Sequence, residues 1–191
     1  MNALYMIRHS ITEGNERRLY YGATDLPLTE AGRALCRSLR GAYALSPEIT
    51  YATSGMLRTE ETLSLLFGDV DHEILPDLRE MEMGVFEMHS YDELKDTAEY
   101  QAWLADTEGN YRIPGGESNR EMAQRVCSCV QALGRRPGPD LLVVCHGGVI
   151  AHAMNDCFPT PGKSFYHWIP ESCHGFAIFF QDGKAVSYKP I

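Results

Sequence analysis

Two stretches far apart in the chain join an apolar run to a histidine, and this repeated pattern is the first sign of chemistry. One runs over residues 4–7 and continues into Arg8 and His9, and the other runs over residues 141–145 and continues into His146. Such runs predict strands that are buried on both faces of a parallel sheet. Because ligand sites in open α/β sheets lie at the carboxyl ends of the strands, we expect His9 and His146 to meet in one site.

A third junction adds charge to the same edge. Residues 49–53 predict a strand, and Ser54 is expected to open a helix with Arg58 in its first turn. Gly147 follows His146, so backbone N–H groups at a turn and a helix N-terminus can face an anion. Basic groups gathered in a chain of net charge −9 predict a local anion pocket, and the expected ligand is a phosphate.

The rest of the chain supplies the elements that would hold these residues. Strands alternate with helices, which predicts one α/β domain over residues 1–191, with 85–117 a candidate cap inserted over the site. Strands are expected at 3–9, 49–53, 74–75, 141–145, 172–180 and 184–189, and helices at 30–41, 54–67, 90–104 and 149–157 and after a capping box at Ser118.

Composition narrows the classes of protein and of partner. The 191 residues are 44% hydrophobic and 23% charged, as in ordinary globular domains, and the negative net charge disfavours nucleic acid and anionic membranes as partners. No leader pattern or membrane-length apolar run is evident, and the six cysteines lack disulfide-scaffold spacing, so a cytoplasmic protein is expected. Cys127 and Cys129 have poor metal-site spacing, and His152 is expected to be structural.

Several short motifs together resemble the histidine phosphatase superfamily, also called the phosphoglycerate mutase-like family. Its opening pattern Arg-His-Gly-x-Thr-x-x-Asn corresponds to Arg8, His9, Thr12 and Asn15, with Ser10 in place of glycine. Five further family motifs follow in the family's order. The first comprises Asp25, Pro27, Leu28, Thr29 and Gly32, and the second comprises Ser54, Arg58 and Thr62, with Gly55 replacing proline. The third comprises Leu78, Glu80, Gly84 and Glu87, with Phe86 replacing tryptophan, and the last two lie at 114–118 and 146–148.

The resemblance implies a fold and a set of roles. The fold would be a three-layer α/β/α sandwich, with helices on both faces of a mostly parallel central sheet. His9 would be the nucleophile that forms a phosphohistidine, while Arg8, Arg58 and His146 would hold the phosphoryl oxygens. The expected substrate-binding residues are Ser10, Asn15, Tyr21, Gly22 and Gly147. No cofactor and no metal are implied, because arginine and imidazole supply the charge.

The resemblance also assigns the acid. Glu80 would protonate the leaving oxygen and then deprotonate the attacking water. Glu82 would share a strand face with Glu80, and Glu87 is near in sequence, so one acid could raise the pKa of another. The alternative is that two of the three are solvated surface acids.

Three functions remain open. A phosphatase is favoured over a phosphoglycerate mutase because residues 85–117 carry only Lys95 and Arg112 as basic residues to grip a second anion. The segment from Leu78 to Glu87 is similar to the α-ribazole phosphatase and broad-specificity branch, which makes α-ribazole 5′-phosphate a candidate substrate. Aromatic residues that could line a leaving-group pocket are Tyr20, Tyr21, Phe86, Tyr91, Tyr100, Trp103 and Tyr111. The third alternative is a phospho-ligand binding module without turnover, and a homodimer is left open.

Overall fold

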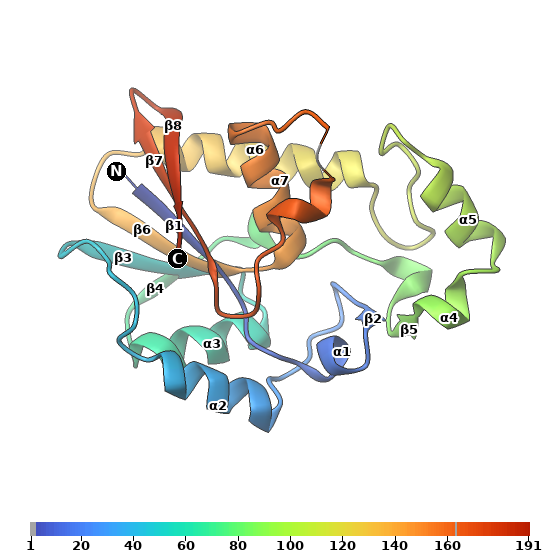
Figure 1. The fold of residues 1–191 in the computed structure, drawn as a ribbon, viewed down its shortest axis with the longest axis horizontal. Helices are drawn as coiled ribbons and strands as arrows, with labels where there is room; N and C mark the ends of the chain where they lie inside the picture. Colours follow the sequence, from blue (N-terminus) through green and yellow to red (C-terminus); the bar gives the residue numbers. More distant parts are fainter. Residues whose placement is uncertain (1–2, 163) are drawn as a thin grey trace.

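The computed structural model describes residues 3–162 and 164–191 (Figure 1). The strands are β1 (Ala3–Arg8), β2 (Leu19–Tyr20), β3 (Ile49–Thr53), β4 (His72–Ile74), β5 (His89–Ser90), β6 (Asp140–Cys145), β7 (Gly175–Gln181) and β8 (Lys184–Pro190). The α-helices are α1 (Glu13–Glu16), α2 (Glu30–Leu39), α3 (Leu57–Phe67), α4 (Tyr91–Leu94), α5 (Ala98–Ala105), α6 (Asn119–Arg135) and α7 (Gly147–Cys157), and the 3₁₀ helices are η1 (Pro76–Leu78), η2 (Gly84–Phe86) and η3 (Phe165–Trp168).

The main sheet has the strand order β4-β3-β6-β1-β7-β8. The four strands β4, β3, β6 and β1 run parallel, while β7 and β8 are antiparallel to their neighbours. The register places Arg8 beside Cys145, and Thr53 beside Val144. The carboxyl ends of β1, β6 and β3 are therefore level and adjacent, and the residues after each strand emerge at the same edge of the sheet.

Alternate residues of the central strands are buried on opposite faces, which gives the protein its layers. Leu4 and Met6 pack in one apolar cluster with residues of α6 and α7, and Tyr5 and Ile7 pack on the other face with Leu63 of α3. Figure 1 shows α6 and α7 on one side of the sheet and α2 and α3 on the other. The burial of both faces of β1 explains its continuous apolar sequence. Because helices cover both faces of the sheet, the expected three-layer α/β/α fold is confirmed.

Most expected elements occur near their expected bounds, with two corrections. Ser54 does not open α3, which begins at Leu57 after the extended Met56. The helix expected over 90–104 is two short helices, α4 and α5, because Thr97 caps a new helix through the backbone N–H of Tyr100. Ser118 forms the expected capping box with Glu121.

The candidate cap, 85–117, contains β5, α4 and α5, which lie to one side of the main sheet (Figure 1). It is tied to the N-terminal loop because β5 pairs with β2 in a separate two-stranded sheet. Trp103 of α5 packs against Tyr20, and the ring centroids lie 6.1 Å apart. None of the helices in the described part of the chain combines the length and the apolar composition needed to cross a membrane.

Candidate active site

A cavity of about 280 Å³ lies at the carboxyl ends of the central strands. Six of the residues predicted for the site line it, namely Arg8, His9, Asn15, Tyr21, Arg58 and Glu80. The other lining residues are Leu19, Tyr20, Met81, Met83, Trp103, Asn119, Met122, Gly148, His152, Phe165, Tyr166 and Ile169. The inner end of the cavity is thus basic, and most of the remaining wall is apolar or aromatic.

His9 is buried directly after β1 and is held as a single tautomer. Its Nδ1–H donates to the carbonyl oxygen of Ser10 at 2.6 Å, which leaves Nε2 with a free lone pair. Burial, and next the positive charge of Arg58, hold the pKa of His9 well below 6.5. The ring is therefore neutral at neutral pH, as a nitrogen nucleophile requires.

His146 lies beside His9, with the two ring centroids 5.2 Å apart, and both of its nitrogens have protein partners. Arg58 Nε donates to Nδ1 at 3.3 Å, so the ring proton is on Nε2, which donates to Ser54 Oγ at 2.8 Å. Burial, and next Arg58, keep the pKa of His146 well below 6.5. Ser54 thus orients this ring, and a phosphoryl oxygen would compete with Ser54 Oγ for the Nε2 proton.

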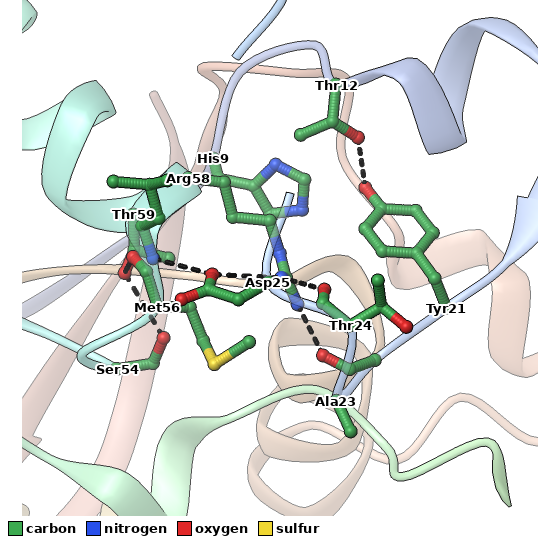
Figure 2. Close-up of polar contacts among 12 residues, drawn as sticks. His9, Thr12, Tyr21, Ala23, Thr24, Asp25, Ser54, Met56, Arg58 and Thr59 are labelled. Carbon is green, nitrogen blue, oxygen red and sulfur yellow. Dashed lines mark hydrogen bonds and ion pairs between the residues drawn. The ribbon is translucent and has the colours of Figure 1, made fainter. Parts of the chain in front are cut away.

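Arg58 is a fully buried cation held by the loop before α2 (Figure 2). Its Nη2 donates to the carbonyl oxygen of Gly22 at 2.8 Å and its Nη1 to that of Thr24 at 3.1 Å, while Asp25 Oδ1 lies 3.9 Å from Nη1. Its guanidinium carbon lies 5.1 Å from the centre of the Tyr21 ring. Asp25 also accepts the backbone N–H of Leu57, at the start of α3.

The loop that holds Arg58 is itself held by Glu87. The carboxylate accepts the backbone N–H groups of Gly22, Ala23 and Thr24, and also that of Met83. Burial raises the pKa of Glu87, but these hydrogen bonds and that from the Thr24 hydroxyl outweigh it and hold the pKa below 4.5. Glu87 is therefore neither a surface acid nor a rival to Glu80, because its oxygens are committed to the loop.

Arg8 supplies the second cation of the cavity. Its Nη1 donates to the carbonyl oxygen of Pro170 at 2.9 Å, which fixes the side chain. Its Nε is buried without a hydrogen-bond partner among the described residues. A buried guanidinium N–H is costly to leave unpaired, so this atom is suited to an anion bound in the cavity.

Asn15 also presents a donor to the cavity. Its Oδ1 accepts the backbone N–H of Thr12 at 3.0 Å and the hydroxyl of Tyr21 at 3.1 Å. The Tyr21 and Thr12 hydroxyls are 2.7 Å apart (Figure 2). Because these bonds occupy the amide oxygen, the amide nitrogen is left as the group of Asn15 that can bind an anion.

Glu80 lines the cavity, and its carboxylate accepts the backbone N–H groups of Gly148 and Met81, each at 3.1 Å. The expectation that Glu82 shares a strand face with it is wrong, because residues 79–83 form neither a strand nor a helix. Glu82 is exposed and lines a neighbouring hollow with Arg112 instead. Of these two acids, only Glu80 lines the cavity that His9 also lines.

Four residues expected to contact substrate do not line the cavity: His146, described above, and Ser10, Gly22 and Gly147. The Ser10 hydroxyl donates to the carbonyl oxygen of Gly32 in α2 at 2.8 Å, so its side chain joins the loop after β1 to this helix. Gly22 packs so closely that a Cβ would lie 1.6 Å from the carbonyl oxygen of Met81. Gly147 leaves room for Arg8, since a Cβ there would lie 3.3 Å from Arg8 Nε. The backbone of Met81 thus requires glycine at Gly22, whereas at Gly147 the nearest atom to a Cβ would be Ile169 Cγ2 at 3.1 Å, a tight side-chain contact.

The outer wall includes residues that the sequence analysis does not place in the site. Phe165, Tyr166 and Ile169 come from η3 and the residue after it, and His152 of α7 packs against Phe165 with ring centroids 4.6 Å apart. Burial lowers the pKa of His152 to about 4, so its ring is neutral near pH 7. Among the expected aromatic residues, Phe86, Tyr91, Tyr100 and Tyr111 lie outside the cavity wall.

The buried histidines predict a strong acid sensitivity of folding. His9, His146 and His152 stay neutral in the folded protein below pH 6.5, whereas the unfolded chain takes up protons there. The free energy of unfolding is therefore greatest above pH 6.5 and falls with decreasing pH by up to about 1.4 kcal/mol per unit per histidine. Urea unfolding between about pH 7.5 and 5 measures this slope.

The His152→Leu variant is the control for this slope. Removing one of three such groups is expected to reduce the slope by about a third, since the other two still remain unprotonated in the folded state. A free energy of unfolding that stays constant down to about pH 5 would mean that these rings bind protons equally well when folded.

Comparison with known proteins adds the family. The model for "Histidine phosphatase superfamily (branch 1)" matches residues 4–187. The adenosylcobalamin/alpha-ribazole phosphatase of Salmonella typhimurium is 30% identical, covering 91% of this chain and 92% of its own. A Salmonella choleraesuis protein named probable phosphoglycerate mutase is 36% identical, covering 96% of this chain and 87% of its own. The crystal structure of the alpha-ribazole phosphatase from Shigella flexneri has a TM-score of 0.81 and 26% identity, covering 96% and 93%.

Proposed function

Because the chain belongs to the histidine phosphatase superfamily, branch 1, we propose that it is a phosphomonoesterase working through a phosphohistidine on His9. The observation that carries the proposal is the pairing of a neutral, tautomer-fixed His9 with two buried or half-buried arginines in one cavity. The nucleophile then faces the anion-binding groups that would stabilise charge during transfer.

The reaction has two displacements on phosphorus. Nε2 of His9 forms a bond to phosphorus as the ester P–O bond breaks, and Glu80, in its protonated form, gives its proton to the leaving oxygen. A water molecule then attacks the phosphohistidine, Glu80 takes the water's proton, and phosphate leaves with the His9 lone pair restored. Arg8, Arg58 and the amide nitrogen of Asn15 would bind the phosphoryl oxygens, and His146 would donate its Nε2 proton to one of them in place of Ser54.

The apolar and aromatic residues that line the cavity favour a leaving group that is uncharged and at least partly aromatic. Leu19, Met83, Trp103 and Phe165 offer apolar surface, and the neutral His152 adds a polar group without charge. The Salmonella typhimurium relative is named for alpha-ribazole, and α-ribazole 5′-phosphate is the specific substrate that we propose.

A phosphoglycerate mutase is the second candidate, favoured by the 36% identity to the Salmonella choleraesuis protein. A carboxylated substrate needs a further cation for its second anionic group. Among residues 3–162 and 164–191, Arg8 and Arg58 are the only arginine or lysine residues that line the cavity, and both would already bind the phosphate. Lys95 pairs with Asp92, and Arg112 pairs with Glu121 at the surface. This charge distribution favours the phosphatase.

Purified protein assayed on a panel of phosphomonoesters tests the proposal. We expect vanadate-sensitive release of phosphate, with kcat/KM higher for aromatic and nucleoside-like esters such as α-ribazole 5′-phosphate than for 3-phosphoglycerate. Interconversion of the phosphoglycerates, primed by their bisphosphate, would identify a mutase instead. Tight binding of phosphorylated compounds with no phosphate release would identify a binding module.

Two glutamine substitutions separate the candidate acids. Glu80→Gln is expected to lower kcat by roughly 10²- to 10⁴-fold on an alkyl phosphate, because the poor leaving oxygen loses its proton donor. Glu82→Gln is the matched control, and its exposed side chain predicts activity within about twofold of the unmodified protein. A larger loss in Glu82→Gln than in Glu80→Gln would reverse the assignment.

A further inference from the structure

The segment that carries Glu80 lacks regular secondary structure, so something else must fix its path. Residues 79–83 connect η1 to η2 without a sheet or helix hydrogen-bond ladder. Among residues 3–162 and 164–191, the Glu80 carboxylate accepts two backbone N–H groups and no side-chain donor. Its position relative to His9 therefore depends on how this irregular backbone is held.

One arginine from α6 holds that backbone. Nη1 of Arg125 donates to the carbonyl oxygens of Asp77 and Arg79 at 2.8 and 2.7 Å, and Nη2 donates to the carbonyl oxygen of Glu80 at 3.1 Å. Three carbonyls, one in η1 and two in the irregular segment after it, thus converge on a single guanidinium. Neutral carbonyls bound to a charged donor make stronger hydrogen bonds than neutral pairs do.

Arg125 is oriented in turn by Glu117. Nε and Nη2 of Arg125 donate to the two carboxylate oxygens of Glu117, which is 8% exposed. Glu117 also grips the other side of the segment, because its Oε1 accepts the backbone N–H of Glu82 at 3.1 Å and its own N–H donates to the carbonyl of Glu82 at 3.0 Å. The pair therefore holds the chain on both sides of Glu80.

All five N–H donors of Arg125 are used by these contacts: one from Nε, two from Nη1 and two from Nη2. The guanidinium has no donor left for a substrate anion, and neither Arg125 nor Glu117 lines the cavity that contains His9. Arg125 is thus poorly placed to bind phosphate and well placed to orient the residue that would move the proton.

We propose that Arg125 and Glu117 form a positioning pair that sets the Glu80 carboxylate for proton transfer to the leaving oxygen. The inference rests on the proposed phosphatase function, in which Glu80 is the acid and base. It predicts that loss of the pair weakens proton donation while the anion-binding groups and His9 remain in place.

The test compares esters that differ in their need for a proton. An alkyl phosphate needs protonation of its leaving oxygen, whereas p-nitrophenolate leaves without it, and kcat/KM reports on the first transfer to His9. Arg125→Met is expected to lower kcat/KM for the alkyl phosphate by roughly 50-fold and for p-nitrophenyl phosphate by less than about fivefold. Glu80→Gln is expected to show the same selectivity, and adding Arg125→Met to it is expected to give little further loss.

Three variants complete the design. Glu117→Gln, which keeps the side-chain size, is expected to give the same selectivity as Arg125→Met and serves if that variant fails to fold. Arg125→Lys is expected to recover part of the alkyl phosphate activity, since an ammonium group supplies three donors. Arg120→Met is the matched control on the exposed face of α6, and both activities are expected to stay unchanged.

Different results would overturn different claims. If Arg125→Met and Glu117→Gln lowered kcat/KM equally for both esters while Glu80→Gln still affected mainly the alkyl phosphate, the pair would have only a general structural role. The proposed phosphatase function would not be affected by that result. Unchanged activity in both variants would also refute the positioning role. Failure of the unmodified protein to hydrolyse either ester would refute the phosphatase proposal itself.

Discussion

Replacement of His9 by alanine is expected to lower kcat by roughly 10⁴-fold or more, because the proposed covalent route depends on this nucleophile. His146 cannot take its place, since its Nδ1 accepts from Arg58 and its Nε2 carries the proton. A rapid quench after mixing with ³²P-labelled substrate measures the intermediate directly. The unmodified protein is expected to carry an acid-labile, base-stable label, and His9→Ala none.

The control for this experiment is His72→Ala, which removes an exposed histidine from the edge strand β4. Both turnover and labelling are expected to stay close to those of the unmodified protein. Persistent labelling in His9→Ala would move the nucleophile to another residue and would overturn the mechanism, whatever the loss of activity.

Arg58→Lys is expected to affect catalysis and folding together, since one buried guanidinium serves both. Lysine keeps the charge but loses the planar fork that contacts His146, Gly22 and Thr24 simultaneously. We expect kcat/KM to fall by roughly 10³-fold. The free energy of unfolding is expected to fall by about 1–3 kcal/mol, because buried carbonyl oxygens lose their donors. Steady-state kinetics and urea unfolding measure the two effects.

Arg37→Lys gives the surface counterpart. Arg37 forms an exposed ion pair with Glu30 on α2, and such pairs contribute little, so activity within twofold and stability within about 0.5 kcal/mol are expected. If Arg58→Lys changed kcat/KM and the free energy of unfolding as little as Arg37→Lys, a positive charge without the guanidinium geometry would be enough for catalysis and folding at this position.

The meeting of His9, His146 and Arg58 could be predicted from the sequence because strand pattern and chain direction determine it. Apolar runs mark buried parallel strands, and the residues that follow such strands emerge at one edge of the sheet. The apolar pattern of a strand does not predict the direction of the side chains that follow the end of that strand. The pattern places Ser10 beside His9, but it does not predict that the Ser10 hydroxyl bonds to the carbonyl of Gly32.

Irregular segments account for the other differences. Glu82 was placed with Glu80 by assuming a two-residue strand period, which fails where the chain has no strand. Phe165 and Tyr166 belong to a four-residue 3₁₀ helix, too short to leave a periodic pattern, and Phe165 packs against His152 of α7. The Arg125–Glu117 pair joins side chains to backbone carbonyls, and a carbonyl carries no signal in the sequence.

The central place of β6, between β1 and β3, has a consequence for biosynthesis. During translation β1 and β3 are made long before Asp140–Cys145 leaves the ribosome, and β7, the other neighbour of β1, follows later still. Until then the nascent chain holds Arg8 at the end of β1 and Arg58 in α3, the helix after β3, while β6, the strand that joins β1 to β3, is still missing and leaves apolar strand edges unpaired. A ribosome stalled before residue 140 would thus carry both arginines without an assembled anion site.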